Sequence, residues 1–411
     1  MSFLPFILST IYFYISGTLF FDLVHYALHQ WSRSQWRFLR FLSRCHSYHH
    51  LYYPSSLQFN PRYARQNALI ALPLELACQL LGSILAYIPL AQILNLKQAM
   101  PTTNLAPAPA PYNTIPPLLL TLTLSTLRST FVIAANGRDS NHLALSSIPK
   151  DKSWVTVGPE YHALHHVHPD RYMGSLVRVF DWIMGTSYSL RGKKVVMTGG
   201  EGALGRALER RFVGEGAKCI TKLKFGVDWE NGDFKRAGDA FAHMDADILV
   251  LAHGTKGLDA MRSNCISSVK LIESFLHQKS KAKAKAKTKT LPEIWYIGSE
   301  AELHPSWGNL EMARYSASKR AFLPYARALY ASDAVVYRHI VPAAFDSPMG
   351  RAIVSADWAA ACAMWWIRRG AWYIPVTYTG IAFLNFFKFL GVRRNGRWVD
   401  KLGLGKGWYV S

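Results

Sequence analysis

The chain has 411 residues, enough for two domains or more, and half of them are hydrophobic. Its net charge of +21 is uneven: residues 1–190 contain 13 Lys and Arg against 7 Asp and Glu, whereas residues 191–411 contain the remaining 34 and 19. The five cysteines form no C-x2-C pair and no even set, which favours a reducing compartment with no disulfide scaffold.

Three apolar stretches in the first half are long enough to cross a bilayer, which takes about 20 residues. They run from residue 3 to about 24, from 68 to 94 and from 115 to 135. The first has no basic leader and no small-residue cleavage site, so we interpret it as an anchor rather than a signal peptide. The Pro/Ala-rich segment 101–117 is typical of an extended linker.

The basic residues predict how these stretches are oriented. Six arginines lie between the first and second stretches, only Lys97 lies between the second and third, and Arg138, Lys150 and Lys152 follow the third. The positive-inside rule then places residues 25–65 and everything after residue 136 in the cytosol. We expect a multi-pass membrane protein of the endoplasmic reticulum whose active sites are both cytosolic.

Eight of the 15 histidines form three clusters near the ends of these stretches, with the spacings H-x3-H, H-x2-HH and H-x2-HH. Helical residues three and four apart share a face, so each cluster directs two or three imidazoles at one point. Imidazole is the commonest protein metal ligand, and eight of them exceed the four that one zinc ion needs, which favours two metal ions. The predicted ligands are His25, His29, His46, His49, His50, His162, His165 and His166.

Two carboxylates precede these clusters and are candidates to orient imidazoles. Asp22 lies one turn before His25, and Glu160 lies two residues before His162. Solvation of both carboxylates is the alternative.

From Gly192 onward the pattern changes to short strands and helices. Residues 193–198 predict a strand, which leads into a glycine-rich turn and a helix over 206–213. Gly199, Gly202 and Gly205 have the spacing G-x2-G-x2-G, which lets backbone amides and a helix N-terminus approach a pyrophosphate. Residues 217–221 predict the second strand.

The end of that second strand bears on the choice of dinucleotide. An acid usually stands there when the 2′-hydroxyl of NAD is bound, but this chain has Lys222 and Lys224, and no acid until Asp228. Basic residues suit a 2′-phosphate, which favours NADP(H). Two solvated lysines are the alternative.

Further strands are predicted at 247–252, which leads to Gly254, and at 293–298, which leads to Ser299. A helix that carries Asn264 lies between them. Segment 279–289 has six lysines in eleven residues. It could tether the chain to nucleic acid or to anionic lipid, but we favour a solvated surface insertion and predict no nucleic-acid partner.

Tyr315 and Lys319 lie one turn apart on a predicted helix. The Lys319 ammonium is expected to lower the pKa of the phenol, so that the tyrosine can exchange a proton near neutral pH. Ser299 would hold the substrate oxygen by a hydrogen bond. This arrangement favours hydride exchange with a nicotinamide.

The first 190 residues resemble the fatty acid hydroxylase/sterol desaturase superfamily of membrane di-iron oxygenases, through HYALH, CHSYHH, YHALHH and RVFDWIMGTSY. They are most similar to the wax-synthesis aldehyde decarbonylases. The resemblance implies an all-α membrane helix bundle with the eight histidines as iron ligands. It also implies a lipid-like substrate, O2 and an external electron donor such as a cytochrome b5 system. Relatives often have another histidine near residue 138, and His142 is a candidate for that role.

Residues 192 to about 350 resemble the short-chain dehydrogenases/reductases, which implies a Rossmann-like, doubly wound parallel sheet. Thr198 and the three spaced glycines match the cofactor turn, and Gly254 belongs to the same cofactor site. The matches to the catalytic tetrad are Asn264, Ser299, Tyr315 and Lys319. Two departures are Pro342-Ala343-Ala344 in place of a Pro-Gly loop, and a short stretch between the second and third strands.

We therefore expect two domains: a membrane hydroxylase/desaturase-like domain at 1–190 and an NADP-binding reductase-like domain at 191–411. The expected function is O2-dependent di-iron hydroxylation or desaturation of a lipid-like substrate, together with NADP(H)-dependent interconversion of an alcohol and a carbonyl. Two alternatives remain open: a decarbonylase-like enzyme with a regulatory nucleotide-binding domain, and a non-enzymatic metal-binding membrane protein.

Overall fold

The computed structural model describes residues 3–99, 113–230, 232–283, 290–303 and 309–391. The chain divides into two compact units, unit 1 (Met1–Ser187) and unit 2 (Tyr188–Ser411). Most of the predicted Pro/Ala linker and of the lysine-rich segment lie outside the described residues.

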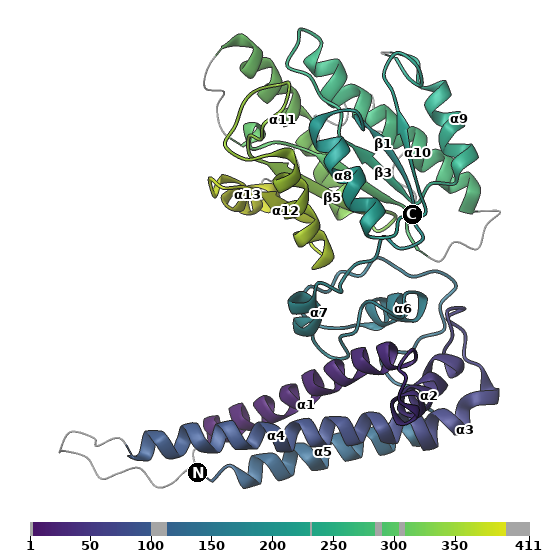
Figure 1. Cartoon of the computed structure of the whole chain (residues 1–411), viewed down its shortest axis with the longest axis vertical. Helices are drawn as coiled ribbons and strands as arrows, with labels where there is room; N and C mark the ends of the chain where they lie inside the picture. The colour runs from purple at the N-terminus through teal and green to yellow at the C-terminus, as the bar shows by residue number, and fades with distance from the viewer. Residues whose placement is uncertain (1–2, 100–112, 231, 284–289, 304–308, 392–411) are drawn as a thin grey trace. The chain divides into compact units, whose positions relative to one another are not determined.

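Unit 1 is built on three long helices that pack side by side: α1 (Phe3–Trp31), α4 (Leu72–Ala99) and α5 (Ile115–Ala134) (Figure 1). Each belongs to a helical segment long and apolar enough to cross a membrane, judged by length and composition. Glycines bring α1 and α4 into close contact, because a Cβ on Gly17 would lie 2.4 Å from Ser83 Oγ and one on Gly82 would lie 2.4 Å from the Phe20 Cβ. Ser83 Oγ donates across this contact to the Phe13 carbonyl at 3.0 Å.

Shorter elements of unit 1 carry most of the histidines. They are α2 (Arg37–Tyr52), α3 (Ala64–Gln66), α6 (Pro159–Val167) and α7 (Val179–Met184), together with a 3-10 turn at Pro61–Tyr63 and a π-helical turn at Asn67–Ala71. A small apolar core beside them contains Tyr52, Tyr53, Leu57, Ile148 and Ala163.

Unit 2 contains a six-stranded parallel sheet in the order β2-β1-β3-β4-β5-β6. The strands are β1 (Lys194–Thr198), β2 (Cys219–Leu223), β3 (Ile248–Leu251), β4 (Glu293–Ile297), β5 (Val336–Pro342) and β6 (Tyr373–Val376). Every residue of β3 and β4 is buried, as expected for strands that are covered on both faces.

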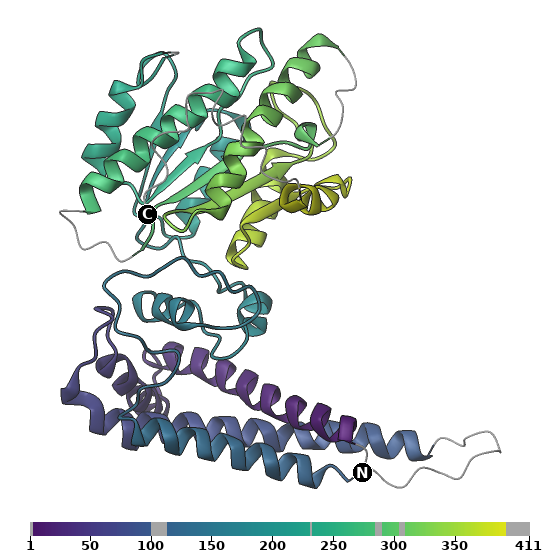
Figure 2. The ribbon, with the colours of Figure 1, turned by 180° about the vertical axis from the view of Figure 1, so that it is seen from behind.

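Helices cover both faces of this sheet (Figures 1 and 2). On one face α8 (Ala203–Gly214) packs against α12 (Ala356–Arg368). The other face carries α9 (Lys235–Met244), α10 (Ser267–Lys283), α11 (Leu310–Ala331) and α13 (Ile381–Gly391). The predicted doubly wound parallel sheet is therefore confirmed, and β2 lies two residues later than the sequence predicts.

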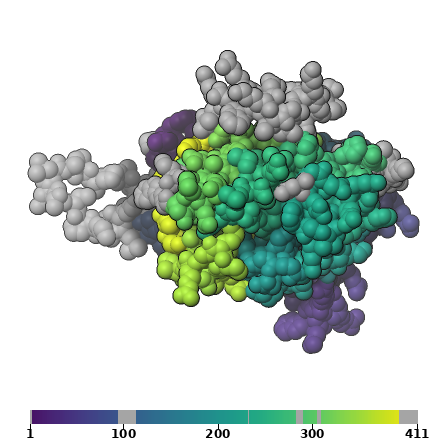
Figure 3. Space-filling model, turned by 90° about the horizontal axis from the view of Figure 1, so that it is seen from above, coloured from purple at the N-terminus to yellow at the C-terminus, as the bar shows by residue number. Residues whose placement is uncertain are grey.

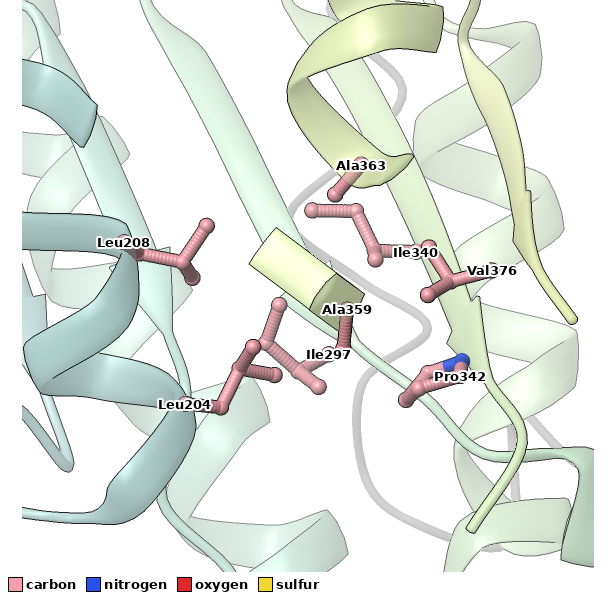
Figure 4. Close-up of a pocket in the computed structure, with 8 residues that line it drawn as sticks. All are labelled: Leu204, Leu208, Ile297, Ile340, Pro342, Ala359, Ala363 and Val376. Atoms are coloured by element: carbon pink, nitrogen blue, oxygen red, sulfur yellow. The ribbon is translucent and has the colours of Figure 1, made fainter. Parts of the chain in front are cut away.

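One small gap lies between the sheet and the helices α8 and α12 (Figure 4). Its lining side chains are all apolar: Leu204, Leu208, Ile297, Ile340, Pro342, Ala359, Ala363 and Val376. With no polar group to orient a ligand, the gap is a packing irregularity of the core rather than a substrate site.

Candidate functional site

The structure gathers nine histidines of unit 1 into two clusters, within each of which the candidate ligand nitrogens lie within 4.8 Å of one another. The five-histidine cluster consists of His25, His29, His46, His50 and His165. The four-histidine cluster consists of His49, His142, His162 and His166. Sequence neighbours are divided between the two, as in His49 and His50, because consecutive helical side chains point about 100° apart.

The spacing of the ring nitrogens fits a shared ion in each cluster. In the five-histidine cluster the Nε2 atoms of His29 and His25, and those of His46 and His29, are 3.2 Å apart. In the four-histidine cluster the Nε2 atoms of His162 and His142 are 2.9 Å apart. Two nitrogens bound at right angles to one ion, each at about 2.1 Å, lie about 3.0 Å apart.

Hydrogen bonds on the other ring nitrogen support the same interpretation. Nδ1 of His165 donates to the Arg171 carbonyl at 2.8 Å, and Nδ1 of His25 donates to the Met173 carbonyl at 3.3 Å. With the proton on Nδ1, the Nε2 atoms present lone pairs to one another, an arrangement that a cation between them stabilises.

Burial keeps these imidazoles in the neutral form that binds metals. It lowers the pKa of His49 and of His165 to about 3. Burial also lowers the pKa of His46, of His50 and of His162 well below the usual value, with a further contribution from the neighbouring imidazoles.

His142, the candidate ninth ligand, is held by Asp139. Its Nδ1 lies 2.6 Å from Asp139 Oδ1, and the other carboxylate oxygen lies 3.6 Å from Arg128 Nη2. Burial alone would raise the pKa of Asp139, but the hydrogen bonds from His142 and from the Asn141 amide, together with the charge of Arg128, hold that pKa below its usual range. Sequence reasoning missed Asp139, although its position three residues before His142 was an available signal.

A second carboxylate that sequence reasoning missed, Asp181, anchors the loop behind the five-histidine cluster. Its two oxygens accept hydrogen bonds from the amides of Met173 at 2.9 Å and of Gly174 at 2.7 Å. The Met173 carbonyl is in turn the partner of His25, so Asp181 positions an imidazole through the backbone.

The two carboxylates that the sequence suggested have other surroundings. Asp22 is fully buried, and its Oδ1 accepts from the amide of Ser175 at 3.0 Å and from its hydroxyl at 2.6 Å. Asp22 therefore fixes a loop, and no hydrogen bond joins it to an imidazole among the described residues. No hydrogen bond joins Glu160 to a histidine among the described residues.

In unit 2 the glycine-rich turn lies between β1 and α8. Gly199 has φ +68°, and a Cβ there would lie 2.5 Å from the amide nitrogen of His253. A Cβ on Gly205 would lie 2.2 Å from the Gly199 carbonyl oxygen, so only glycine fits. Gly202 is the N-cap of α8 and makes no side-chain cap, which leaves the first amides of the helix for a ligand.

Thr198 and Gly254 border the same turn. The Thr198 hydroxyl bonds Nδ1 of His253 at 2.6 Å, and burial lowers the pKa of His253 to about 3. The side chain of Asn264 lies 3.2 Å from where a Gly254 Cβ would stand. A side chain at residue 254 would therefore crowd the predicted catalytic residues.

Lys222 contacts two carboxylates at this turn. Its Nζ lies 3.2 Å from Glu201 Oε1 and 3.1 Å from Glu209 Oε2, and its methylenes lie over Gly200. The lysine is therefore not the solvated cation that the sequence offered as an alternative. A 2′-phosphate would meet a lysine already paired with acids.

The four predicted catalytic residues lie around the carboxyl end of β4. Ser299 follows β4 and starts a 3-10 turn at Glu300–Glu302, where its hydroxyl accepts from the Ala301 amide at 3.2 Å, and its side chain lies close enough to Tyr315 to lower the pKa of that phenol. Lys319 Nζ donates to the Ile297 carbonyl at 2.7 Å and lies 5.9 Å from the centre of the Tyr315 ring.

Asn264 sits in a π-helical turn, Arg262–Ile266, that opens α10. Its side chain accepts from the Thr255 amide at 2.8 Å and donates to the Ser318 hydroxyl at 2.8 Å. The residue therefore ties the loop after β3 to α11, the helix that carries Tyr315 and Lys319.

One electrostatic expectation is wrong for this state of the protein. Burial raises the pKa of Tyr315 to about 12, and the Ser299 hydrogen bond offsets only part of that rise. Burial also lowers the pKa of Lys319 to about 8. Lys319 does not reverse the rise on Tyr315, because its ammonium is itself desolvated and directed at a backbone carbonyl.

A buried acid near this site was not foreseen. Glu302 Oε1 lies 2.6 Å from Nε2 of His339, and Nδ1 of His339 lies 2.7 Å from the Tyr337 hydroxyl. The charge of Glu302 opposes the lowering of the Lys319 pKa. No sequence spacing marks these three residues as a group.

No protein-family model matches the chain. Monoglucosyldiacylglycerol epimerase from Synechocystis sp. is 30% identical over 262 residues, which cover 57% of this chain and 61% of that protein. The chain thus spans less than two thirds of this curated relative.

Among solved structures, a short-chain dehydrogenase from Burkholderia cenocepacia in complex with NADP matches at 15% identity and a TM-score of 0.40, covering 53% of this chain and 99% of its own. A short-chain dehydrogenase from Sphingobium yanoikuyae in complex with NADPH matches at 13% identity and a TM-score of 0.39, covering 53% and 98%. The Rossmann-like architecture of unit 2 is established by its own parallel sheet. The resemblance of unit 1 to hydroxylases and desaturases stays a prediction.

Proposed function

We propose that this chain is a membrane-bound oxidoreductase with two active sites, a di-iron oxygenase in unit 1 and an NADP(H)-dependent reductase in unit 2. The observation that carries the oxygenase is the convergence of nine Nε2 atoms into two clusters. The substrate we propose is lipid-like and reaches the histidines from the bilayer.

In unit 1 the two clusters would each hold one iron ion, and two irons together supply O2 activation for C–H hydroxylation or desaturation. The protein's part is to keep the imidazoles neutral and aligned. Burial keeps the imidazoles neutral, and the hydrogen bonds at Nδ1 of His25, His142 and His165 keep the rings aligned. Electrons would come from an external donor of the cytochrome b5 kind.

In unit 2 the glycine turn and the α8 N-terminus would hold the pyrophosphate, and NADP(H) supplies or accepts the hydride when bound. Tyr315 would exchange a proton with the substrate oxygen, and Ser299 would hold that oxygen by a hydrogen bond. Lys319 would hold its ammonium on the Ile297 carbonyl, 5.9 Å from the centre of the Tyr315 ring, and Asn264 fixes the geometry of the two helices involved.

The two reactions suit one lipid. Hydroxylation creates an alcohol, and oxidation of that alcohol to a carbonyl releases two electrons and one proton to NADP⁺ and a second proton through Tyr315. The opposite order, in which a carbonyl is reduced before unit 1 acts, uses the same residues.

A second candidate follows from the curated relative, whose name describes epimerisation of a glucosyl lipid. Unit 2 would then oxidise one sugar hydroxyl to a ketone and return the hydride to the opposite face, with no net consumption of NADP(H). Tyr315 would take the proton in the first half and return it in the second.

Metal analysis and product analysis of separate variants test the proposal. Purified full-length chain is expected to contain two irons, and His165→Ala should lose iron while it keeps NADPH binding. Tyr315→Phe should keep both irons and change the product. Zinc in place of iron, or full iron in His165→Ala, contradicts the oxygenase; sugar inversion without O2 or net NADPH use supports the epimerase.

A further inference from the structure

The last helix of unit 2 has an apolar face on its exposed side. In α13 the side chains of Ala382, Asn385 and Phe389 are buried against the domain. On the opposite side Leu384 and Phe387 are each 73% exposed. This side also carries Ile381, Phe383 and Leu390, all exposed. The helix is therefore apolar around most of its circumference, which is unusual for a surface helix of a soluble domain.

The end of α12 extends this face. The rings of Trp366 and Phe383 lie 6.0 Å apart, and those of Trp365 and Trp366 lie 4.8 Å apart. Trp365 is 48% exposed, and the guanidinium of Arg369 lies 3.7 Å from the centre of its ring. We call the exposed set Trp365, Ile381, Phe383, Leu384, Phe387 and Leu390 the α12–α13 surface; both helices lie at the surface of the molecule (Figure 3).

The charge on these two helices is mostly positive. Within 356–391 the chain has Arg368, Arg369 and Lys388 against one acid, Asp357, and Arg368 is paired with Glu215. Arg369 and Lys388 are the cations on the two helices nearest to the exposed rings, and Lys388 donates to the Leu303 carbonyl at 3.3 Å. A second copy of the chain would bring the same positive charge against itself, which disfavours a dimer through this face.

We propose that the α12–α13 surface docks unit 2 onto an anionic lipid bilayer. Apolar side chains flanked by tryptophan and by cations are the composition of helices that lie in the membrane interface. The three long apolar helices of unit 1 belong to the same polypeptide, so a bilayer that they cross would have unit 2 tethered to it. The proposal rests on the membrane location in the proposed function and on neither of its reactions.

Fluorescence quenching on the full-length chain tests the docking. The exposed Cys219 is replaced by serine, Phe387→Cys is labelled with bimane, and the protein is placed in nanodiscs with or without anionic lipid. Doxyl-labelled lipid should lower the emission about twofold or more, and aqueous iodide should have little effect. A label at Val213→Cys on α8, where Val213 is 65% exposed, is the matched control and should respond to iodide alone.

Removal of the two cations near the α12–α13 surface gives a second test of the docking. Each cation near an anionic surface changes the docking equilibrium by roughly fivefold, so Arg369→Gln with Lys388→Gln should weaken docking roughly 25-fold. Quenching of the Phe387→Cys label by iodide but not by lipid overturns the proposal. Protection from both quenchers also overturns it, because protein then covers the surface. Release of the whole chain by alkaline carbonate would instead refute the membrane location itself.

Discussion

The contact between Asp139 and His142 allows one prediction to be worked in detail. The carboxylate lies 2.6 Å from His142 Nδ1 and its side chain is only 15% exposed. A hydrogen bond to a charged group contributes about 1.5–3 kcal/mol, which corresponds to roughly 10–150-fold in a binding constant. Removal of an acid that orients a metal-bound imidazole typically costs 10–100-fold in metal affinity. We therefore expect Asp139→Ala to weaken the four-histidine cluster by about two orders of magnitude.

The assay is the number of irons that the full-length protein retains during titration with a chelator. The wild type should release both irons late, and Asp139→Ala should release one iron early and keep the other, because the five-histidine cluster does not contain His142. Asp139→Asn retains an acceptor oxygen, so its iron release should be earlier than in the wild type and later than in Asp139→Ala. Glu160→Gln, an acid in the first turn of α6, is the control and should behave as the wild type. Equal loss of both irons in Asp139→Ala, or no early loss, would refute the reasoning.

Three further predictions concern unit 2. Gly205→Ala should abolish NADPH binding in a fluorescence titration, because its Cβ would lie 2.2 Å from a carbonyl oxygen, whereas Gly214→Ala on the same helix meets nothing within 4 Å and should bind normally. Glu201→Gln should raise the ratio of NADPH affinity to NADH affinity several-fold, because it removes one of the two acids paired with Lys222, and Lys222→Gln should lower that ratio; equal ratios in both variants would contradict a role at the 2′-phosphate. The reductase rate should fall as pH rises through about 8, where Lys319 loses its proton, and Lys319→Arg should remove that fall; an unchanged profile would exclude Lys319 as its source.

Local spacing was sufficient to predict most helices and strands, and it singled out eight of the nine histidines that the structure gathers into clusters. The apolar runs gave the three long helices, and alternation of short buried strands with helices gave the parallel sheet. A helix or strand of this kind is recognised from the spacing of its hydrophobic residues, and a turn such as the one at Gly199 from its steric need for glycine. Both signals come from residues that are close together in the sequence.

Only the tertiary structure decided how the functional groups are combined. The division of His49 and His50 between two clusters depends on which other helices face each side of α2. The pairing of Lys222 with two acids and the desolvation of Tyr315 depend on side chains brought in from other elements. Such contacts join residues far apart in the chain, and their energies depend on burial, which a single sequence does not fix.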